Sequence, residues 1–552
     1  MDNSFLQIGT ILVLATTFGL GVRLLKQPLI LAYILTGMSF GAMGLLGAAS
    51  GETLSLLSTF GITFLLFMVG LELRLEDLKQ VGKPVLFIGF GQVILTFIAS
   101  LILSLILGFD SLASVYISLA LTFSSTIITV KLLSDRRDLS SLYGRISVSI
   151  LLVQDFVAIF ILMFLSSTKA GVAFNPITFL LVFVKILALF LVISLLIKRA
   201  IPFLFRVLAQ NQELLFLAAV TWCFLFASVS LLLGFSLEIG AFLAGVSLSS
   251  LPYHYQISSR IRPLRDLFVT LFFVALGMRM VLASGLDFLF SAIALSVFVL
   301  LVKPLIVMFL MGRAGFRKRT GFLTSITLAQ ISEFSLILVT IGQGLGHLGK
   351  GEASVIVGVG ILTITTSNYL VMASQRIFHR IGDYLSIFEI ANLHERRPKL
   401  EKKLENHTIL VGCNRTGTDI LELLKKKEGP YLVLDFDPEI IRTLEAQNIP
   451  CLFGDITDEE IIEQINLEKA KLIISTVPSL EDNLVLVSSA KLKNSEGVVI
   501  VTANFPDEAD ELYRAGADYV ILPQLLGGKH IAHLLGEHTD NLEEYLYSKR
   551  KK

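Results

Sequence analysis

The chain has 552 residues, of which 54% are apolar and 16% are charged, and its mean hydropathy is +0.75. This composition is more apolar than that of an ordinary globular protein and indicates a polytopic membrane protein. The net charge of +1 gives no electrostatic footprint for nucleic-acid binding. The three cysteines are far apart, without a CxxC pair, which argues against zinc sites and a disulfide framework.

Apolar segments follow one another up to about residue 378. A transmembrane helix needs about 20 apolar residues, and on that basis we expect about thirteen spans. The ninth and tenth are short, and short or interrupted spans can mark broken helices in transporters. The first lacks a basic region and a cleavage pattern, so we expect it to be retained as a span. The spans lie near 5–25, 28–46, 53–71, 84–108, 112–133, 143–166, 175–197, 212–233, 236–250, 266–281, 286–311, 320–343 and 352–378.

Lysine and arginine are concentrated in every second loop between the spans. The loops after odd-numbered spans are basic, whereas the even-numbered loops carry only Lys169, Arg279 and Lys350. By the positive-inside rule the basic loops face the cytoplasm. We therefore expect a multi-pass protein of the cell (inner) membrane with its N-terminus outside and everything after the last span in the cytoplasm.

Four ionisable residues within these spans stand out as candidates: Asp155, Lys303, Glu333 and Lys185. Such groups are costly in a membrane and usually face a bundle interior or a water-filled cavity. Asp155 is a candidate for cation and proton binding, and a partnership with Lys303 would let it exchange one for the other. The alternative readings are a structural ion pair for Asp155 and Lys303, a helix cap for Glu333, and a snorkelling role for Lys185.

A run of hydroxyls, Ser124, Ser125 and Thr126, lies midway through the fifth span. Hydroxyls can satisfy the backbone groups of an interrupted helix, and an unwound segment offers oxygen atoms to a dehydrated cation. They are also common at ordinary helix interfaces. Gln154, next to Asp155, is a further neutral oxygen donor. A site with few charges should favour the ion that is cheaper to dehydrate.

Several segments carry a family resemblance: "LTFSSTIITVKLL", "RISVSILLVQDFVAIFIL", "GFSLEIGAFLAGVSL", "LFFVALGM" and "LAQISEFSLIL". In this order they resemble the cation:proton antiporter-2 family, especially its Kef-type potassium-efflux branch. The resemblance implies an all-α membrane domain of thirteen helices built from inverted repeats. It also implies two crossed broken helices, at "FSSTII" and "QISEF", and a preference for K⁺ from the Gln154–Asp155 pair.

After a charged linker, strands and helices alternate from "HTILVGCNRTG" to "ADYVILP". This alternation predicts an α/β domain, a doubly wound parallel sheet of about six strands. Its first turn is a variant dinucleotide fingerprint, and an aspartate ends the second strand at the expected distance for a ribose contact. The candidate nucleotide-binding residues are Gly412, Asn414, Arg415, Thr416, Gly417, Asp435, Asp437 and Asp455.

The segments "LVGCNRTG", "LDFDPE", "FGDITDEE" and "IISTVPSLEDN" resemble the nucleotide-binding N-lobe of domains that regulate potassium conductance in Trk- and Kef-type systems. The resemblance implies NAD(H), AMP or ATP as a regulatory ligand and pairing as a homodimer through both domains. We expect a membrane domain at 1–378, a linker at 379–406, a Rossmann-like domain at 407–525 and a tail at 526–552.

The sequence thus predicts a transporter, not an enzyme. The protein is expected to lie in membrane lipid and to exchange K⁺ for H⁺ across the membrane under the control of a nucleotide. No resident metal is expected. A membrane-bound dehydrogenase would need a substrate domain, and no sequence remains to build one. A ligand-gated K⁺ efflux pathway of channel type and a Na⁺/H⁺ antiporter stay open as alternatives.

Overall fold

The computed structural model describes the two parts of the chain as separate compact units. One unit comprises Met1–Leu132 and Ile146–Ala391, and the other Leu133–Arg145 and Asn392–Lys552. The described residues are 4–25, 27–43, 48–72, 82–136, 138–139, 141–166, 204–205, 208, 211–232, 237–249, 251–279, 285–382, 384–389, 404–413, 416–427, 429–435, 438–454, 456, 459–494, 496–528 and 532.

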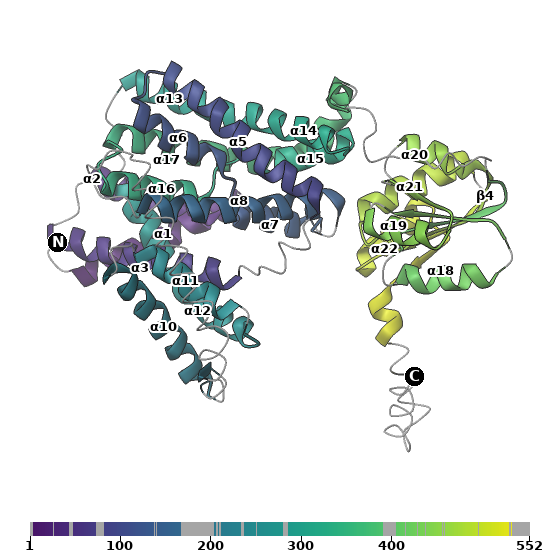
Figure 1. Ribbon diagram of the computed structural model, residues 1–552, viewed down its shortest axis with the longest axis horizontal. Coiled ribbons are helices and arrows are strands. Elements are labelled where there is room, and N and C mark those ends of the chain that lie inside the picture. The colour runs from purple at the N-terminus through teal and green to yellow at the C-terminus, as the bar shows by residue number, and fades with distance from the viewer. Residues whose placement is uncertain are drawn as a thin grey trace. The chain divides into compact units, whose positions relative to one another are not determined.

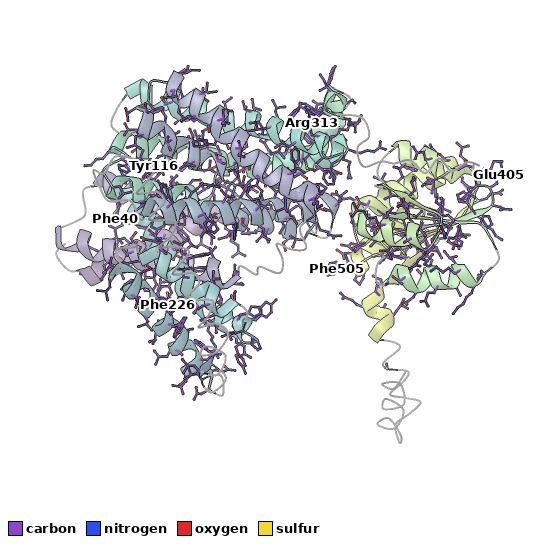
Figure 2. The ribbon with its side chains drawn as sticks, in the orientation of Figure 1. Phe40, Tyr116, Phe226, Arg313, Glu405 and Phe505 are labelled. Carbon is purple, nitrogen blue, oxygen red and sulfur yellow. The ribbon has the colours of Figure 1, made fainter. Side chains whose placement is uncertain are left out.

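The first unit is built from helices, and one group of them packs around α3 and α12 (Figure 1). Here α3 packs on α11 and α12, α12 on α2, α10 on α11, and α1 on α2. Phe40 and Phe226 lie in this group (Figure 2). Its helices are α1 (Ser4–Leu24), α2 (Leu29–Met43), α3 (Ala48–Glu72), α10 (Gln212–Leu232), α11 (Leu237–Ser249) and α12 (His254–Arg279).

A second group contains the interrupted helices. Its contacts join α5 to α6 and α14, α13 to α17, and α16 to α6 and α17. The helices are α5 (Lys83–Ile106), α6 (Ser111–Thr122), α7 (Thr126–Asp135), α8 (Leu142–Ser166), α13 (Gly285–Val297), the π-helical turn η1 (Phe298–Val302), α14 (Lys303–Arg313), α15 (Lys318–Thr327), α16 (Glu333–Gly344), α17 (Lys350–Ile381) and the 3₁₀ turn η2 (Tyr384–Phe388).

The helices of the first unit account for the expected spans that lie within the described residues. The seventh, near 175–197, lies outside the described residues, and each of the others coincides with a helix or with a pair of half-helices. Among the described residues, seven helices are long and apolar enough to cross a membrane, and three shorter helices are also apolar. The fifth and twelfth spans are broken, as the resemblance implied, at 123–125 and 328–332.

The tenth span differs from the expectation. It was expected to be short, near 266–281, but α12 is a continuous helix of 26 residues from His254 to Arg279. Its first half contains Arg260, Arg262 and Arg265 and therefore lacks the apolar signal of a span. The tenth apolar segment is short because one end of α12 is charged, not because the helix is interrupted.

Glycine allows α3 and α11 to pack with their backbones nearly touching. A Cβ atom on Gly245 of α11 would lie 2.1 Å from the carbonyl oxygen of Phe67, and one on Gly70 of α3 would lie 2.2 Å from that of Phe242. Both approaches are far shorter than a van der Waals contact. Only glycine fits at this crossing, which rigidifies the first helix group.

The second unit contains a six-stranded sheet in which every strand pair is parallel, in the order β3-β2-β1-β4-β5-β6. The doubly wound sheet expected from the sequence is thereby confirmed. The register pairs Val411 of β1 with Leu434 of β2 and with Ser475 of β4. The strands are β1 (His407–Val411), β2 (Tyr431–Asp435), β3 (Cys451–Phe453), β4 (Ala470–Ser475), β5 (Val498–Thr502) and β6 (Tyr519–Ile521).

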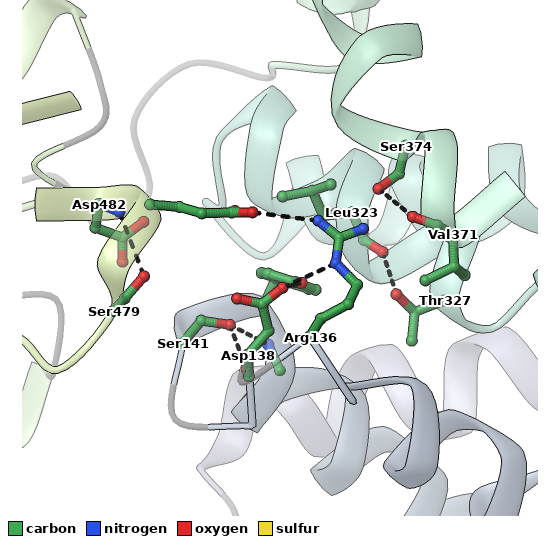
Figure 3. A network of polar contacts seen from close by, with 12 residues as sticks. Arg136, Asp138, Ser141, Leu323, Thr327, Val371, Ser374, Ser479 and Asp482 are labelled. Atoms are coloured by element: carbon green, nitrogen blue, oxygen red, sulfur yellow. Dashed lines mark hydrogen bonds and ion pairs between the residues drawn. The ribbon is translucent and has the colours of Figure 1, made fainter. Parts of the chain in front are cut away.

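Helices cover both faces of this sheet, and Figure 1 shows α18 and α21 on opposite sides of it. The apolar side chains of strands and helices form two buried clusters, one on each face. The helices are α18 (Thr416–Lys426), α19 (Pro438–Ala446), α20 (Glu459–Gln464), η3 (Leu467–Lys469), α21 (Leu480–Lys493) and α22 (Pro506–Ala515). The same unit includes the turn between α7 and α8, where Arg136 Nε lies 3.2 Å from Asp138 Oδ2 (Figure 3).

The glycine contact between α3 and α11 yields a stability prediction. Gly245→Ala should lower the free energy of unfolding by about 1–3 kcal/mol, because the added methyl group must push two backbones apart. Gly9→Ala is the matched control, since a Cβ on Gly9 meets nothing within 4 Å. Thermal unfolding of the two purified variants measures the difference, and equal melting temperatures would contradict the packing argument.

A buried histidine at the start of β1 yields a second prediction. His407 is fully buried, its Nε2 donates to Ile465 O at 2.9 Å, and its Nδ1 has no partner in the described part of the chain. Burial lowers the pKa of His407 from its usual 6.5. The unfolded chain therefore binds more protons than the folded domain below about pH 6.5, so stability falls as the pH falls.

His407→Gln keeps a donor for Ile465 O but removes the titration. We expect the stability of this variant relative to wild type to rise as the pH is lowered from 7 to 5.5, which hydrogen exchange of the β1 amides would measure. A difference that does not change with pH would show that the protonation of His407 does not contribute.

Candidate functional site

Two helix breaks cross in the second helix group. α6 ends at Thr122 and α7 begins at Thr126, while α15 ends at Thr327 and α16 begins at Glu333. Hydrogen bonds link the breaks directly: Ser124 Oγ donates to Leu328 O at 2.9 Å, and Thr129 Oγ1 donates to Thr327 O at 3.2 Å. The two interrupted segments therefore form one structure, although about 200 residues separate them.

The carbonyl ends of α6 and α15 converge on an ammonium group. Lys303 Nζ donates to Leu121 O at 3.2 Å, to Phe123 O at 3.1 Å and to Gln330 O at 3.0 Å, and its side chain is fully buried. The C-terminal end of a helix carries about half a negative charge, and two such ends face this cation. Lys303 thus satisfies three carbonyls that the breaks leave without a helical partner.

The amide ends of α7 and α16 have the opposite polarity, and carboxylates lie beside them. Glu333, the first residue of α16, accepts from Ser125 Oγ at 2.7 Å and from Ser332 Oγ at 3.4 Å. Asp155 of α8 accepts from Thr126 Oγ1, at the start of α7, at 2.8 Å. Negative charge is favourable at helix N-termini, so the crossing separates a cationic side from an anionic side.

Asp155 differs from the other ionisable groups of the crossing in its exposure. Lys303 is fully buried and Glu333 is 8% exposed, whereas Asp155 is only partly buried. Among the described residues, Thr126 is the one hydrogen-bond partner that its side chain has. Asp155 is therefore the most accessible of these three ionisable groups.

Gln154 supports the break through its side-chain amide. Its Oε1 accepts from Ser124 N at 2.9 Å and its Nε2 donates to Gln92 Oε1 at 2.7 Å. Gln92 of α5 in turn donates to Thr122 O at 3.0 Å and to Thr96 Oγ1 at 3.1 Å. Gln92 was missed from the sequence, where its only signal is a lone amide within the apolar stretch "GFGQVILTF".

The predicted site residues thus lie together, but in different partnerships from those expected. In the described structure Asp155 bonds Thr126 and Lys303 bonds backbone carbonyls, so no ion pair joins these two side chains there. A second missed group surrounds the other break: Gln330 Nε2 donates to Thr129 Oγ1, and Ser367 Oγ donates to Gln330 Oε1. Lys185 lies outside the described residues.

In the second unit, the chain after β1 turns at Gly412 and leads into α18. Gly412 has φ +83°, a left-handed conformation that favours glycine. A Cβ on Gly417 would lie 2.2 Å from Gly412 O, so the start of α18 packs directly on the turn. Thr416 is the first residue of α18, whose N-terminus follows the turn.

Asp435, at the end of β2, is bonded to this turn. Its Oδ2 accepts from Cys413 N at 2.7 Å, and the side chain is buried. The strand order reverses between β1 and β4, and ligands of open α/β sheets bind in the crevice at such a point. Asn414, Arg415, Asp437 and Asp455 lie outside the described residues.

The cysteine in this turn is not a reactive thiol. Burial and the Asp435 carboxylate raise the pKa of Cys413, and burial raises the pKa of Cys451 to about 11. Both thiols therefore remain protonated near neutral pH. They pack in the same apolar cluster against the sheet.

The protein combines crossed half-helices that have ionisable groups between them with a nucleotide-type α/β domain. These features define a multi-pass cation transporter of the antiporter class. Residues 9–371 match the family model described as "Sodium/hydrogen exchanger, transmembrane", and residues 408–523 match the TrkA-N domain. The chain belongs to the sodium/hydrogen exchanger family and carries a cytoplasmic TrkA-N domain.

Two curated relatives align with nearly the whole chain. The chain is 26% identical over 543 residues to the "Putative cation/proton antiporter YbaL" of Escherichia coli (strain K12), covering 95% of each chain. It is 26% identical over 515 residues to the "Putative K(+) efflux antiporter KefB" of Alkalimonas amylolytica, covering 92% of this chain and 78% of the relative. The crystal structure of the TrkA-N domain of inner membrane protein ybaL from Escherichia coli is 28% identical, covering 24% of this chain and 99% of that one, with a TM-score of 0.24.

The two glutamines beside the ion site yield a coupled prediction. Gln154→Leu leaves Ser124 N–H and the Gln92 amide without their partners, and should lower the free energy of unfolding by about 1–3 kcal/mol for each buried group left unpaired. Gln92→Leu should have a similar effect. Because the two amides bond each other, the double variant should lose less stability than the sum of the single variants.

Thermal unfolding of the wild type and the three variants completes a double-mutant cycle, which gives the coupling energy between Gln92 and Gln154. Additive losses would contradict the described bond between Gln92 and Gln154.

Proposed function

We propose that this antiporter exchanges K⁺ for H⁺, with Asp155 holding the two ions in turn. The observation that carries the proposal is the partial exposure of Asp155 at a crossing whose other ionisable groups are buried. Relatives named as K⁺ efflux antiporters support the choice of cation.

Competition for one carboxylate couples the two fluxes. When Asp155 is protonated it is neutral and has no charge with which to hold a cation. When it is ionised it attracts a cation, which Thr126 Oγ1 and the backbone of the break can help to coordinate. A site with one accessible carboxylate, the partly buried Asp155, provides little energy for dehydration, which favours K⁺ over Na⁺.

The other candidate residues of the ion site hold the structure around the Asp155 carboxylate. Gln154 and Ser124 hold the break between α6 and α7, and Lys303 neutralises the carbonyl ends. Ser125 and Glu333 join the amide end of α7 to that of α16. We assign these residues to positioning the ion site, with direct contact to the ion made by Asp155 and Thr126.

We further propose the arrangement of the chain in the membrane. The alternation of basic loops supports an N-terminus outside the cell membrane, with the membrane domain at 1–378, a linker at 379–406, a Rossmann-like domain at 407–525 and a tail at 526–552. The family resemblance supports a homodimer through both domains.

The cytoplasmic domain is proposed to bind an adenine nucleotide, NAD(H), AMP or ATP, as a regulator. The glycine turn at Gly412, the amide groups at the start of α18 and the carboxylate of Asp435 support this assignment. Gly417 permits the close packing of helix and turn. Regulation requires that the nucleotide bind two states of the transporter unequally.

The transport proposal is tested in proteoliposomes with an imposed pH gradient. Wild-type protein should drive K⁺ against its own gradient, and Asp155→Asn should abolish this flux because the variant can hold neither proton nor charge. Asp266→Asn, at a side chain that is 62% exposed, is the control for the same chemical change. Uphill K⁺ flux by Asp155→Asn would refute the role of Asp155.

The same preparation separates the alternatives. Flux that only ever runs down the K⁺ gradient would indicate a channel, and a preference for Na⁺ or Li⁺ over K⁺ would indicate a sodium-type antiporter.

Nucleotide binding is tested by calorimetry on the full chain with NAD⁺, NADH, AMP and ATP. Asp435→Asn keeps an oxygen that can accept from Cys413 N–H but loses the charge offered to ribose hydroxyls, so affinity should fall about tenfold or more. Asp510→Asn, at an exposed position on α22, should bind as the wild type does. Equal nucleotide affinity in Asp435→Asn and Asp510→Asn would show that the nucleotide does not bind at Asp435.

A further inference from the structure

The 3₁₀ turn η2, shortly after the last membrane helix, has three distinct faces. In a 3₁₀ helix the side chains at positions i and i+3 eclipse, so residues fall into three rows. Leu385 and Phe388 form a row that is buried or half-buried, whereas Tyr384 and Ile387 form a row in which both side chains are 81% exposed. The third row is Ser386 with Glu389, the residue that follows the turn, and it bonds another helix.

The turn rests on the end of α14. A Cβ atom on Gly312 would lie 1.8 Å from the carbonyl oxygen of Phe388, so the two backbones are in direct contact there. Gly312 precedes the last residue of α14, Arg313, which is labelled in Figure 2. No larger residue fits at Gly312 while the turn stays in place.

The third row caps α15. Glu389 Oε1 accepts from the backbone N–H of Lys318 at 2.9 Å, and Lys318 Nζ donates to Ser386 Oγ at 3.1 Å. Lys318 is the first residue of α15, and Arg317 at the N-cap position makes no side-chain cap bond. Glu389 therefore supplies from a distant segment the acceptor that the sequence of α15 lacks, and its negative charge suits a helix N-terminus.

The opposite ends of α14 and α15 form the ion site. α14 begins with Lys303, whose ammonium holds the carbonyl ends of the broken helices. α15 ends at Thr327, where the carbonyls of Thr327 and Leu328 accept from Thr129 and Ser124. Its last turn is also bonded internally, with Thr327 Oγ1 donating to Leu323 O at 2.6 Å (Figure 3).

A helix of ten residues is a stiff element about 15 Å long. A shift of its capped end therefore moves the carbonyls at its other end. η2 contacts the outer ends of both helices whose inner ends carry the crossing.

We propose that Glu389 is a positioning residue for ion exchange: by capping α15, it fixes the carbonyls of the crossing and so the geometry around Asp155. The inference rests on the function proposed above for that site.

The test compares two changes at Glu389 with a matched loss of a cap elsewhere. Glu389→Ala removes the acceptor for Lys318 N–H, whereas Glu389→Gln retains an amide oxygen that can accept it. Asn211 caps α10, which contains no break, through bonds of 2.8 and 3.2 Å from Glu213 N and Leu214 N, so Asn211→Ala is the control. Gly312→Ala, which unseats η2, is a second route to the same effect.

In the pH-driven flux assay, Glu389→Ala and Gly312→Ala should raise the KM for K⁺ about fivefold and shift the pH profile, since one cap is lost. Glu389→Gln should stay within about twofold of the wild type, because the cap bond is kept. Asn211→Ala should leave KM and pH profile unchanged even where it lowers the melting temperature. A wild-type KM and pH profile in Glu389→Ala, or an equal shift in Asn211→Ala, would overturn the proposal.

Hydrogen exchange of the same full-length variants gives a readout that does not depend on the transported ion. Glu389→Ala should increase exchange in the first turn of α15 and also at 327–332, whereas an increase confined to the first turn would overturn the proposal. If the wild type shows no cation–proton exchange, the proposed function fails, while the hydrogen-exchange result still decides whether Glu389 positions the crossing.

Discussion

The membrane domain depends on satisfying the backbone groups of two helices that are interrupted at the same place. An interruption in a membrane leaves carbonyls and amides without partners, and each would be costly if it stayed unpaired. The crossing resolves this with opposite charges at opposite ends: Lys303 takes the carbonyls, while Glu333, with Ser125 and Ser332, lies at the amide ends. The neutral glutamines Gln92 and Gln154 complete the set.

This arrangement separates the groups that hold the structure from the group that can change its charge. Lys303 and Glu333 are buried and occupied by several partners, so altering the charge of either would disturb the break itself. Asp155 has one described partner and is partly exposed, so its charge can change at smaller structural cost. Transport chemistry is therefore compatible with a rigid scaffold. The backbone contact between Gly70 and Gly245 provides similar rigidity in the other helix group.

The sequence predicted the elements well and the partnerships less well. Apolar length located the described spans, the hydroxyl run and "QISEF" located the breaks, and strand–helix alternation located the parallel sheet, because each of these signals is local. The sequence suggested a partnership of Asp155 with Lys303, but the described contacts of these side chains are with other groups, because a buried ammonium in a sequence does not reveal which acceptors surround it. Those acceptors are backbone carbonyls, which every residue has and which become available only through the crossing. Gln92 and Glu389 were missed for the same reason: their roles come from segments that are distant in the sequence.

In the proposed mechanism a cation and a proton compete for the carboxylate of Asp155. Calorimetric titration of the purified full-length protein with K⁺, in buffers of different ionisation enthalpy, measures the protons released for each cation bound. At a pH where Asp155 is protonated in the absence of K⁺, we expect release of about one proton per K⁺ and no such release in Asp155→Asn. K⁺ binding whose heat is the same in every buffer over the whole pH range of transport would contradict it.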